Sequence, residues 1–356
     1  PRSASHAPAM NHTRAASSFL LLLPVLLPAQ DAPPGPAPEL QKLAPMLGNW
    51  TGGGVMNEPG GPTTKWTGKG TYAWCLDGHF VQGDFAVQFE GIDGTFVHRS
   101  YLGWDRENKR YVNASVNSGG QAYLNELQLL PDGSHVQISL TRQAGTTYAQ
   151  RSVMKVDGET MKHTMHLLLA EGEPLHMIDG TFTRGGDGFS ATLDGASWMG
   201  AKANEQIVRL GKSAGTYAVV GEMVMMPGAP PMKITGTDTF VARYGGAVLH
   251  GKTEGEAEGM PGKYLGDVFW AHDAGRDCIS GIYVSNMGEV MQLEARWTAD
   301  GRFVATSNAL YQGQPSAQRM MMEFTADGAA KSASNHAIIG TAAPFESFRA
   351  TYTKKK

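Results

Sequence analysis

The fold is decided by the stretch Met161-Lys162-His163-Thr164-Met165-His166-Leu167, in which large and polar side chains alternate. Successive side chains of a β-strand point to opposite faces of the sheet. Positions 161, 163, 165 and 167 therefore share one mostly apolar face, and positions 162, 164 and 166 share a polar one. This pattern predicts a strand with one face toward a core, as in an antiparallel barrel or sandwich.

Similar short segments surround this stretch. Turn residues such as Pro131-Asp132-Gly133 and Asp157-Gly158 separate them. A spacing of about 8–12 residues is typical of an up-and-down barrel or a sandwich. The predicted strands of this region cover residues 80–89, 96–104, 111–116, 122–130, 135–141, 150–156, 161–169 and 175–184, and one short helix is expected at residues 39–47.

The same pattern is written twice along the chain. A shift of 168 residues places Asp132-Gly133 on Asp300-Gly301 and Gln150-Arg151 on Gln318-Arg319. A two-residue insertion then changes the shift to 170, which places His166 on His336 and Pro174 on Pro344. The repeated unit has the size of a whole domain rather than of a solenoid repeat. The sequence therefore predicts an all-β protein made of two tandem antiparallel barrels with few short helices.

The domain organisation follows from this repeat. Barrel copy one is expected at residues 43–184 and copy two at residues 210–356. A Gly-rich linker is expected at residues 185–209 and a Pro-rich linker at residues 30–42. Residues 1–29 are interpreted as upstream residues followed by a signal peptide.

The signal-peptide interpretation rests on residues 10–30. Met10 is followed by Arg14, by an apolar run over residues 19–27, and by Ala29 before Gln30 as a cleavage site. The run is too short to span a bilayer, and no other segment suits a membrane span. We expect a secreted or periplasmic protein. The net charge of −3 gives no basic patch for nucleic acid.

A family resemblance rests on a set of short motifs. They are Leu47-Gly48-Asn49-Trp50-Thr51-Gly52, Pro59-Gly60-Gly61-Pro62, Leu76-Asp77-Gly78, Leu102-Gly103-Trp104-Asp105 and Met177-Ile178-Asp179-Gly180-Thr181-Phe182-Thr183-Arg184. The chain resembles the bacterial domain-of-unknown-function family 1579 in two copies, with calycin (lipocalin-like) barrels. That resemblance implies that Trp50 closes the base of a barrel and that Arg184 packs across its ring. In copy two the corresponding pair is Tyr217 and Lys354. The family implies no established activity.

The candidate ligand-binding residues come from histidines and arginines on predicted strands. His163 and His166 should face opposite sides, whereas a hairpin centred near Gly172 should bring His166 and His176 together on one face. Copy two has His336 and Glu346 at the matching positions. Such pairs can hold a metal or a polar ligand group, or can simply be surface and cross-strand pairs. Arg151 and Arg319 can bind a ligand carboxylate or pair with a neighbouring acid.

Other motifs are assigned no chemistry. Gly211-Lys212-Ser213-Ala214-Gly215 has the spacing of a nucleophile elbow but precedes a predicted strand instead of a helix. Ser152 and Lys155 have the Ser-x-x-Lys spacing, but residues three apart on a strand face opposite ways. Cys75 and Cys278 are interpreted as buried free thiols, with one interdomain disulfide as the alternative. We therefore expect no catalytic residue, no cofactor and no metal.

Two functions remain open at this stage. The first is a non-catalytic exported protein that binds a small apolar or amphipathic ligand inside a barrel. The second is a structural or protein-interaction module with filled barrels and no ligand. An open barrel interior favours the binder, and a packed interior favours the module. An enzyme is the least supported of the three classes, and the sequence names no protein partner.

Overall fold

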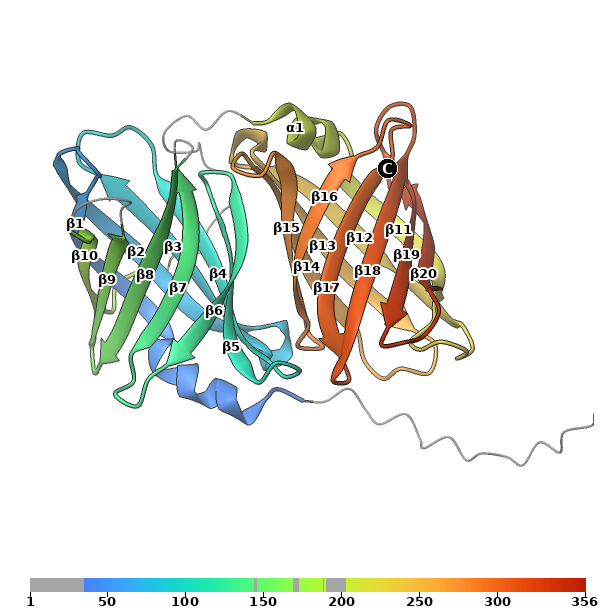
Figure 1. Ribbon diagram of the computed structural model, residues 1–356, viewed down its shortest axis with the longest axis horizontal. Coiled ribbons are helices and arrows are strands. Elements are labelled where there is room, and N and C mark those ends of the chain that lie inside the picture. The colour runs from blue at the N-terminus through green and yellow to red at the C-terminus, as the bar shows by residue number, and fades with distance from the viewer. Residues whose placement is uncertain (1–34, 144–145, 169–172, 188, 190–202) are drawn as a thin grey trace, which may run out of the picture. The chain divides into compact units, whose positions relative to one another are not determined.

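The computed structural model describes residues 35–143, 146–168, 173–187, 189 and 203–356. The described strands form two closed antiparallel barrels, β1–β10 and β11–β20 (Figure 1). In each barrel, every strand pairs with its chain neighbours, and the first strand pairs with the last. The predicted all-β fold with two tandem barrels is confirmed.

The elements of the first barrel agree closely with the sequence prediction. They are η1 (Pro38–Met46), β1 (Gly48–Asn57), β2 (Thr63–Cys75), η2 (Leu76–Gly78), β3 (Phe80–Phe89), β4 (Phe96–Asp105), β5 (Arg110–Asn117), β6 (Gln121–Leu129), β7 (His135–Gln143), β8 (Thr146–Asp157), β9 (Thr160–Leu168) and β10 (Leu175–Arg184). All eight predicted strands are present in order, and β3 and β10 have the predicted bounds.

The second barrel repeats this order. Its elements are α1 (Glu205–Gly211), β11 (Gly215–Met223), β12 (Met232–Arg243), η4 (Tyr244–Gly246), β13 (Val248–Ala257), β14 (Tyr264–Asp273), β15 (Cys278–Ser285), β16 (Val290–Trp297), β17 (Phe303–Tyr311), β18 (Gln314–Phe324), β19 (Ala330–Ile339) and β20 (Phe345–Lys354). The strands follow those of the first barrel at shifts of 167 to 170 residues, so the repeat found in the sequence is a repeat of structure.

A short helix covers the base of each barrel. In η1, a 3₁₀ helix, Leu40, Leu43 and Met46 are buried against the first barrel, so residues 38–42 of the expected linker belong to the barrel instead. In α1, Ile207 and Leu210 are buried against the second barrel. This helix occupies the end of the expected Gly-rich linker. The sequence signal for this helix is Asn204 at the N-cap, followed by apolar residues at helical spacing.

The two barrels pack against each other through corresponding strands. Tyr101 of β4 contacts Phe269 of β14, with ring centroids 6.0 Å apart. Ala114 and Val116 of β5 share a buried cluster with their counterparts Ile282 and Val284 of β15. Because these side chains point out of their own barrels, the junction gives each barrel a second buried face.

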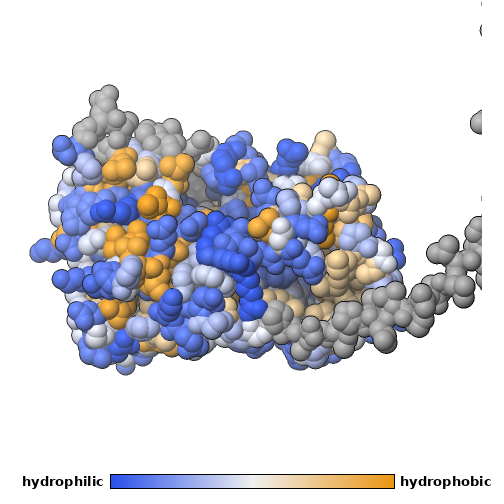
Figure 2. Space-filling view, turned by 60° about the horizontal axis from the view of Figure 1, so that its bottom comes forward, coloured by the Kyte–Doolittle hydropathy of each residue, from blue (hydrophilic) through white to orange (hydrophobic). Residues whose placement is uncertain are grey.

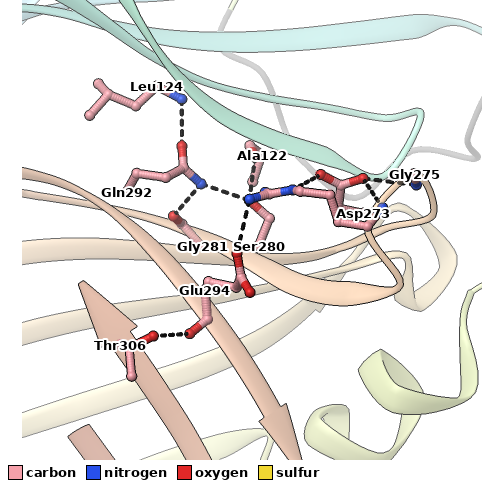
Figure 3. Close-up of polar contacts among 10 residues, drawn as sticks. Ala122, Leu124, Asp273, Gly275, Ser280, Gly281, Gln292, Glu294 and Thr306 are labelled. Carbon is pink, nitrogen blue, oxygen red and sulfur yellow. Dashed lines mark hydrogen bonds and ion pairs between the residues drawn. The ribbon is translucent and has the colours of Figure 1, made fainter. Parts of the chain in front are cut away.

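Polar contacts cross the same junction (Figure 3). The backbone N–H of Leu124 donates to Gln292 Oε1 at 2.7 Å, and the Ser280 hydroxyl donates to the Ala122 carbonyl at 2.9 Å. Gln292 Nε2 also donates to Ser280 Oγ at 2.7 Å, which orders both side chains. These bonds satisfy groups that the junction removes from water.

Beside the junction, Arg99 and Asp84 form a buried bidentate ion pair with N···O distances of 2.7 and 2.8 Å. Both residues belong to the first barrel, on the outward side of β4 and β3. Cys75 and Cys278 are free thiols, and Cys75 is partly buried whereas Cys278 is buried. This agrees with the prediction of two free thiols rather than with the alternative of an interdomain disulfide.

The wall of each barrel is weakest at one matching place. Strands β6 and β7 pair only at Leu127–Gln137, Gln128–Val136 and Leu129–His135. Strands β16 and β17 pair only over 294–297 and 303–306. The remaining described residues of these strands are not in backbone register across that edge, although Ser307 Oγ contacts Met291 Sδ at 3.9 Å, so the backbone pairing of the wall is interrupted there in both copies.

Candidate ligand site inside the first barrel

The base of the first barrel is closed by an apolar layer. Trp50 is fully buried, and its Nε1 donates to the Met46 carbonyl at 2.8 Å. The Arg184 guanidinium lies 4.4 Å from the centre of the Trp50 ring and donates to the carbonyls of Leu47 and Pro45. Copy two repeats the arrangement, with Lys354 Nζ 5.8 Å from the Tyr217 ring. These are the contacts that the family resemblance implies.

Glycines make room for aromatic rings on one side of the interior. A side chain at Gly70 would collide with the Phe85 ring, and one at Gly83 would collide with the Tyr72 ring. Gly180 lies in the same way beneath the Trp66 ring. The inward faces of β1, β2, β3 and β10 therefore form an apolar wall made of large rings packed against bare backbone.

The opposite part of the interior is polar. The strand registers place a set of hydrogen-bonding side chains on the same inward face as the buried core. We call this set the polar belt; it consists of His98, Asn113, Ser115, Tyr123, Gln137, Ser152 and His163.

The belt residues are joined by hydrogen bonds. Asn113 Nδ2 donates to Gln137 Oε1 at 2.8 Å, and the Ser115 hydroxyl donates to Asn113 Oδ1 at 2.7 Å. Ser152 Oγ lies 2.9 Å from His163 Nε2. Tyr123 Oη lies 3.5 Å from His98 Nε2, a long contact that leaves both groups with hydrogen-bonding capacity.

The belt is uncharged at neutral pH. Burial lowers the pKa of His163 to about 4, and burial together with the charge of His163 lowers the pKa of His98 to about 4. Burial also raises the pKa of Tyr123. Among the described inward positions of β1–β10, no Asp, Glu, Lys or Arg is present except Arg184 at the base.

Part of the polar belt is accessible to solvent. His98, Tyr123, Ser152 and His163 remain partly accessible, although they face into a closed barrel. Met165 and Ile178 beside them are partly accessible too. These inward side chains reach water through the interior or through the stretch where β6 and β7 are not paired, so the belt is open to solvent rather than fully packed.

Ser152 and His163 do not form a complete catalytic arrangement with the other described residues. A Ser–His pair acts as a nucleophile when a third group orients the imidazole. Among the described residues, no carboxylate contacts His163. Lys155 points outward and pairs with Asp132 at 3.1 Å, so it lies on the other side of the wall from Ser152. The Gly211–Gly215 segment runs from helix α1 into strand β11, the reverse of a nucleophile elbow.

The predicted site residues divide between the two sides of the barrel wall. His163 lies in the belt, whereas His166, His176 and Arg151 lie on the outer surface. The rings of His166 and His176 stack with centroids 4.5 Å apart and planes 5° apart, so the predicted proximity is correct. Arg151 Nη2 lies 3.5 Å from His166 Nδ1. This group is separated from the interior by the wall.

Copy two places its corresponding residues similarly. Arg319, His336 and Glu346 are consecutive partners across β18, β19 and β20, on the outward side. Glu346 also lies 3.9 Å from Arg349. A ligand role for these outer residues stays a prediction. Among the described residues, no three His, Cys, Asp or Glu side chains are grouped closely enough to hold a metal ion.

A shallow groove on the outer wall of the second barrel has a volume of about 520 Å³. Its lining includes Val220, Lys233 and Glu323, and the ion pair between Arg349 and Glu222 also lies there, at 2.6 Å. This groove lies on the other barrel from the belt and is open to solvent.

The apolar content of the exposed surface is uneven. Figure 2 shows more extensive apolar areas over the first barrel, on the left, than over the middle of the molecule. The most exposed large apolar residues of the first barrel are Ile138, Leu140 and Leu168, on the outer side of β7 and β9. None of the helices in the described part of the chain combines the length and apolarity that crossing a bilayer requires.

Most of the belt was missed by sequence reasoning. Only His163 was among the predicted ligand residues. The available signal was polar residues at every second position of residues 113–117 and 121–125, but such residues normally face solvent. A position-by-position comparison of the two copies indicates the belt more clearly. Because the fold is the same in both copies, a polar residue that only one copy has is not required by the fold.

The comparisons with known proteins agree with the first barrel and its closing motif. The family model described as "Protein of unknown function (DUF1579)" matches residues 35–184. The first barrel is a DUF1579 domain. The family prediction is confirmed, and the second barrel shares the fold as a tandem copy. A comparison with curated protein sequences finds no match.

Three solved structures are similar to parts of this chain. Rv2717c from M. tuberculosis is 16% identical, with a TM-score of 0.33, and the match covers 42% of this chain and 99% of that one. The S-type phycobiliprotein lyase CPES from Guillardia theta is 10% identical, with a TM-score of 0.30, over 41% and 92% of the two chains. A protein of unknown function from the DUF3598 family of Nostoc punctiforme is 11% identical, with a TM-score of 0.26, over 90% and 100%.

Proposed function

We propose that this DUF1579 protein binds a small amphipathic molecule inside its first barrel. The observation that carries the proposal is the partly accessible interior, with a polar belt facing an apolar wall of aromatic rings. A concave apolar site with a few convergent polar groups is the usual form of a small-molecule site. A barrel of this size has room for one small ligand.

The second barrel is proposed to support the first. Ala114 and Val116 of β5 are buried in a cluster that includes Ile282 and Val284 of β15 in the second barrel. Apolar surface of this kind stabilises the pair by about 25 cal/mol for each Å² removed from water. The structural module considered from the sequence therefore describes the second barrel better than the whole chain.

The proposed ligand binding is tested with the purified chain. Native mass spectrometry of protein from its own host should show a bound molecule, and Nile red, a neutral apolar dye, should become fluorescent on binding. Absence of both signals, with the protein folded by circular dichroism, contradicts the proposal. Ser152→Trp, which places a large ring among the belt residues, should abolish dye binding. The matched change Thr164→Trp on the outer side of β9 should leave it unchanged.

Export is a separate proposal. It is supported only by the sequence pattern of residues 10–30, and these residues lie outside the part of the chain that the structure describes. Expression of the full chain with a C-terminal tag, followed by cell fractionation, should yield a mature protein that begins at Gln30. Recovery of the uncleaved chain in the cytoplasm contradicts it.

A further inference from the structure

The two barrels differ at the positions of the polar belt. Because β4–β8 correspond to β14–β18 at a shift of 168 residues and β9 corresponds to β19 at 170, each belt residue has a known counterpart. In belt order, the counterparts are Gly266, Gly281, Tyr283, Met291, Ala305, Met320 and Ala333. Only Tyr283 retains a polar group, so copy two has lost nearly all of the belt.

This difference shows that the fold does not need polar groups at these positions, since the second barrel has its inward polar groups elsewhere, such as Asp238, Gln318 and Asn335. The second barrel closes with ten strands and the same register while glycine, alanine and methionine occupy these positions. Burying a polar group costs free energy unless its hydrogen bonds are replaced. The first barrel has polar groups at six positions where its copy has glycine, alanine or methionine, and these groups must be supplied with hydrogen-bond partners inside the barrel. A role in recognition explains why the polar groups are there.

The chemistry of the belt restricts what it can recognise. Neutral imidazole both donates and accepts hydrogen bonds, and the Tyr123 hydroxyl and the amides of Asn113 and Gln137 do the same. At the described positions of belt height, no cationic side chain is present to bind a carboxylate, and no anionic one to bind an ammonium group. An ionised head group would therefore enter without a counter-charge, at a large desolvation cost.

We propose that the polar belt binds the uncharged head group of an amphipathic ligand, such as a hydroxyl, carbonyl or amide, and that the second barrel lacks this site. The apolar body of the ligand packs against the rings of Trp66, Tyr72 and Phe85. The long Tyr123–His98 contact opens to admit the head group between them. This inference rests on the proposed function, because it names the ligand class of the same interior.

The copies themselves supply the test variants. Ser152→Met, Gln137→Ala and His163→Ala each install the residue that copy two has at that position. In the second barrel, Met320→Leu is the matched control, because it changes the position equivalent to Ser152 without touching the belt. His166→Ala is the control on the outer side of β9.

The probes are 1-decanol, decanoate and decylammonium, which share one chain and differ in head-group charge. Each is titrated at neutral pH against Nile red already bound to the protein. We expect 1-decanol to displace the dye at concentrations at least about ten-fold lower than either ion, since one lost hydrogen bond or unpaired charge of about 1.4 kcal/mol is ten-fold in affinity. Ser152→Met and His163→Ala should each weaken 1-decanol binding by about ten-fold while leaving Nile red binding nearly unchanged.

The outcomes separate this inference from the proposed function. Dye binding with equal displacement by all three probes, or by 1-decanol equally well in the belt variants, overturns the inference and leaves interior binding standing. Absence of dye and probe binding in the folded wild-type protein overturns both. If His163→Ala does not fold, Ser152→Met and Gln137→Ala decide the result, since neither removes a ring from the interior.

Discussion

The three histidines inside the first barrel should make its stability depend steeply on pH. Burial lowers the pKa of His98, His135 and His163 to about 4, whereas each has its ordinary value of 6.5 in the unfolded chain. Between these values the unfolded chain binds protons that the folded protein does not. The free energy of unfolding therefore falls as the pH decreases from 6.5 towards 4.

The size of the effect follows from the proton count. In the middle of this interval each histidine takes up slightly less than one proton on unfolding. This lowers the free energy of unfolding by about 1.2 kcal/mol per pH unit for each histidine. His163→Ala should remove one such contribution, and slightly more, because the charge of His163 also lowers the pKa of His98.

The assay is urea unfolding followed by tryptophan fluorescence at several pH values between about 7 and 5, with the slope of free energy against pH compared between variants. Comparing slopes cancels the titration of every group that the substitution does not affect. Thr164→Ala, beside His163 but on the outer side of β9, should keep the wild-type slope. A His163→Ala slope equal to that of wild type refutes the reasoning, because it means that His163 is already hydrated in the folded barrel.

Three further predictions concern the framework. Arg99→Met leaves Asp84 buried without its ion-pair partner and should lower the free energy of unfolding in urea by about 3–5 kcal/mol. The double variant Asp84→Leu/Arg99→Met should recover most of that loss. Equal destabilisation by the single and double variants contradicts a direct pair. Trp50→Ala should lower the free energy of unfolding by about 3–5 kcal/mol. Trp74→Ala, at a side chain that is 37% exposed, should lower it by less than about 2 kcal/mol. Similar losses in the two variants contradict the barrel-closing role of Trp50. Backbone amides of residues 138–140 that point towards β6 should exchange with deuterium faster than those pointing towards β8; equal protection in mass spectrometry means that the β6–β7 wall is closed in solution.

Much of the fold could be predicted because its determinants are local. Alternation with a period of two, turn residues between strands and a repeat at a constant shift are all visible in the chain itself. The strand bounds of β3 and β10 depend only on such patterns. The Trp50–Arg184 contact was predictable from the family motifs, since both ends of the barrel closure stand at recognisable positions.

The site was less predictable because alternation does not say which face is inside. In β5 the apolar residues Ala114 and Val116 point out of the barrel, because β15 covers them, and the polar residues Asn113 and Ser115 point in. The usual assignment of apolar residues to the barrel interior is therefore reversed in this strand. In β9 it holds, so the alternation places His163 on the inward face; His163 was a candidate because it is a histidine, a criterion that Asn113 does not meet.

The chain by itself determined that a strand-rich unit is present twice, where its strands lie, and which aromatic and basic residues close each base. Only the tertiary structure decided that His163 faces an interior shared with His98 and Tyr123, while His166 and His176 stack on the outer surface. The physical reason is that a strand's sequence specifies two faces, but the neighbouring strands and the second barrel determine what each face meets.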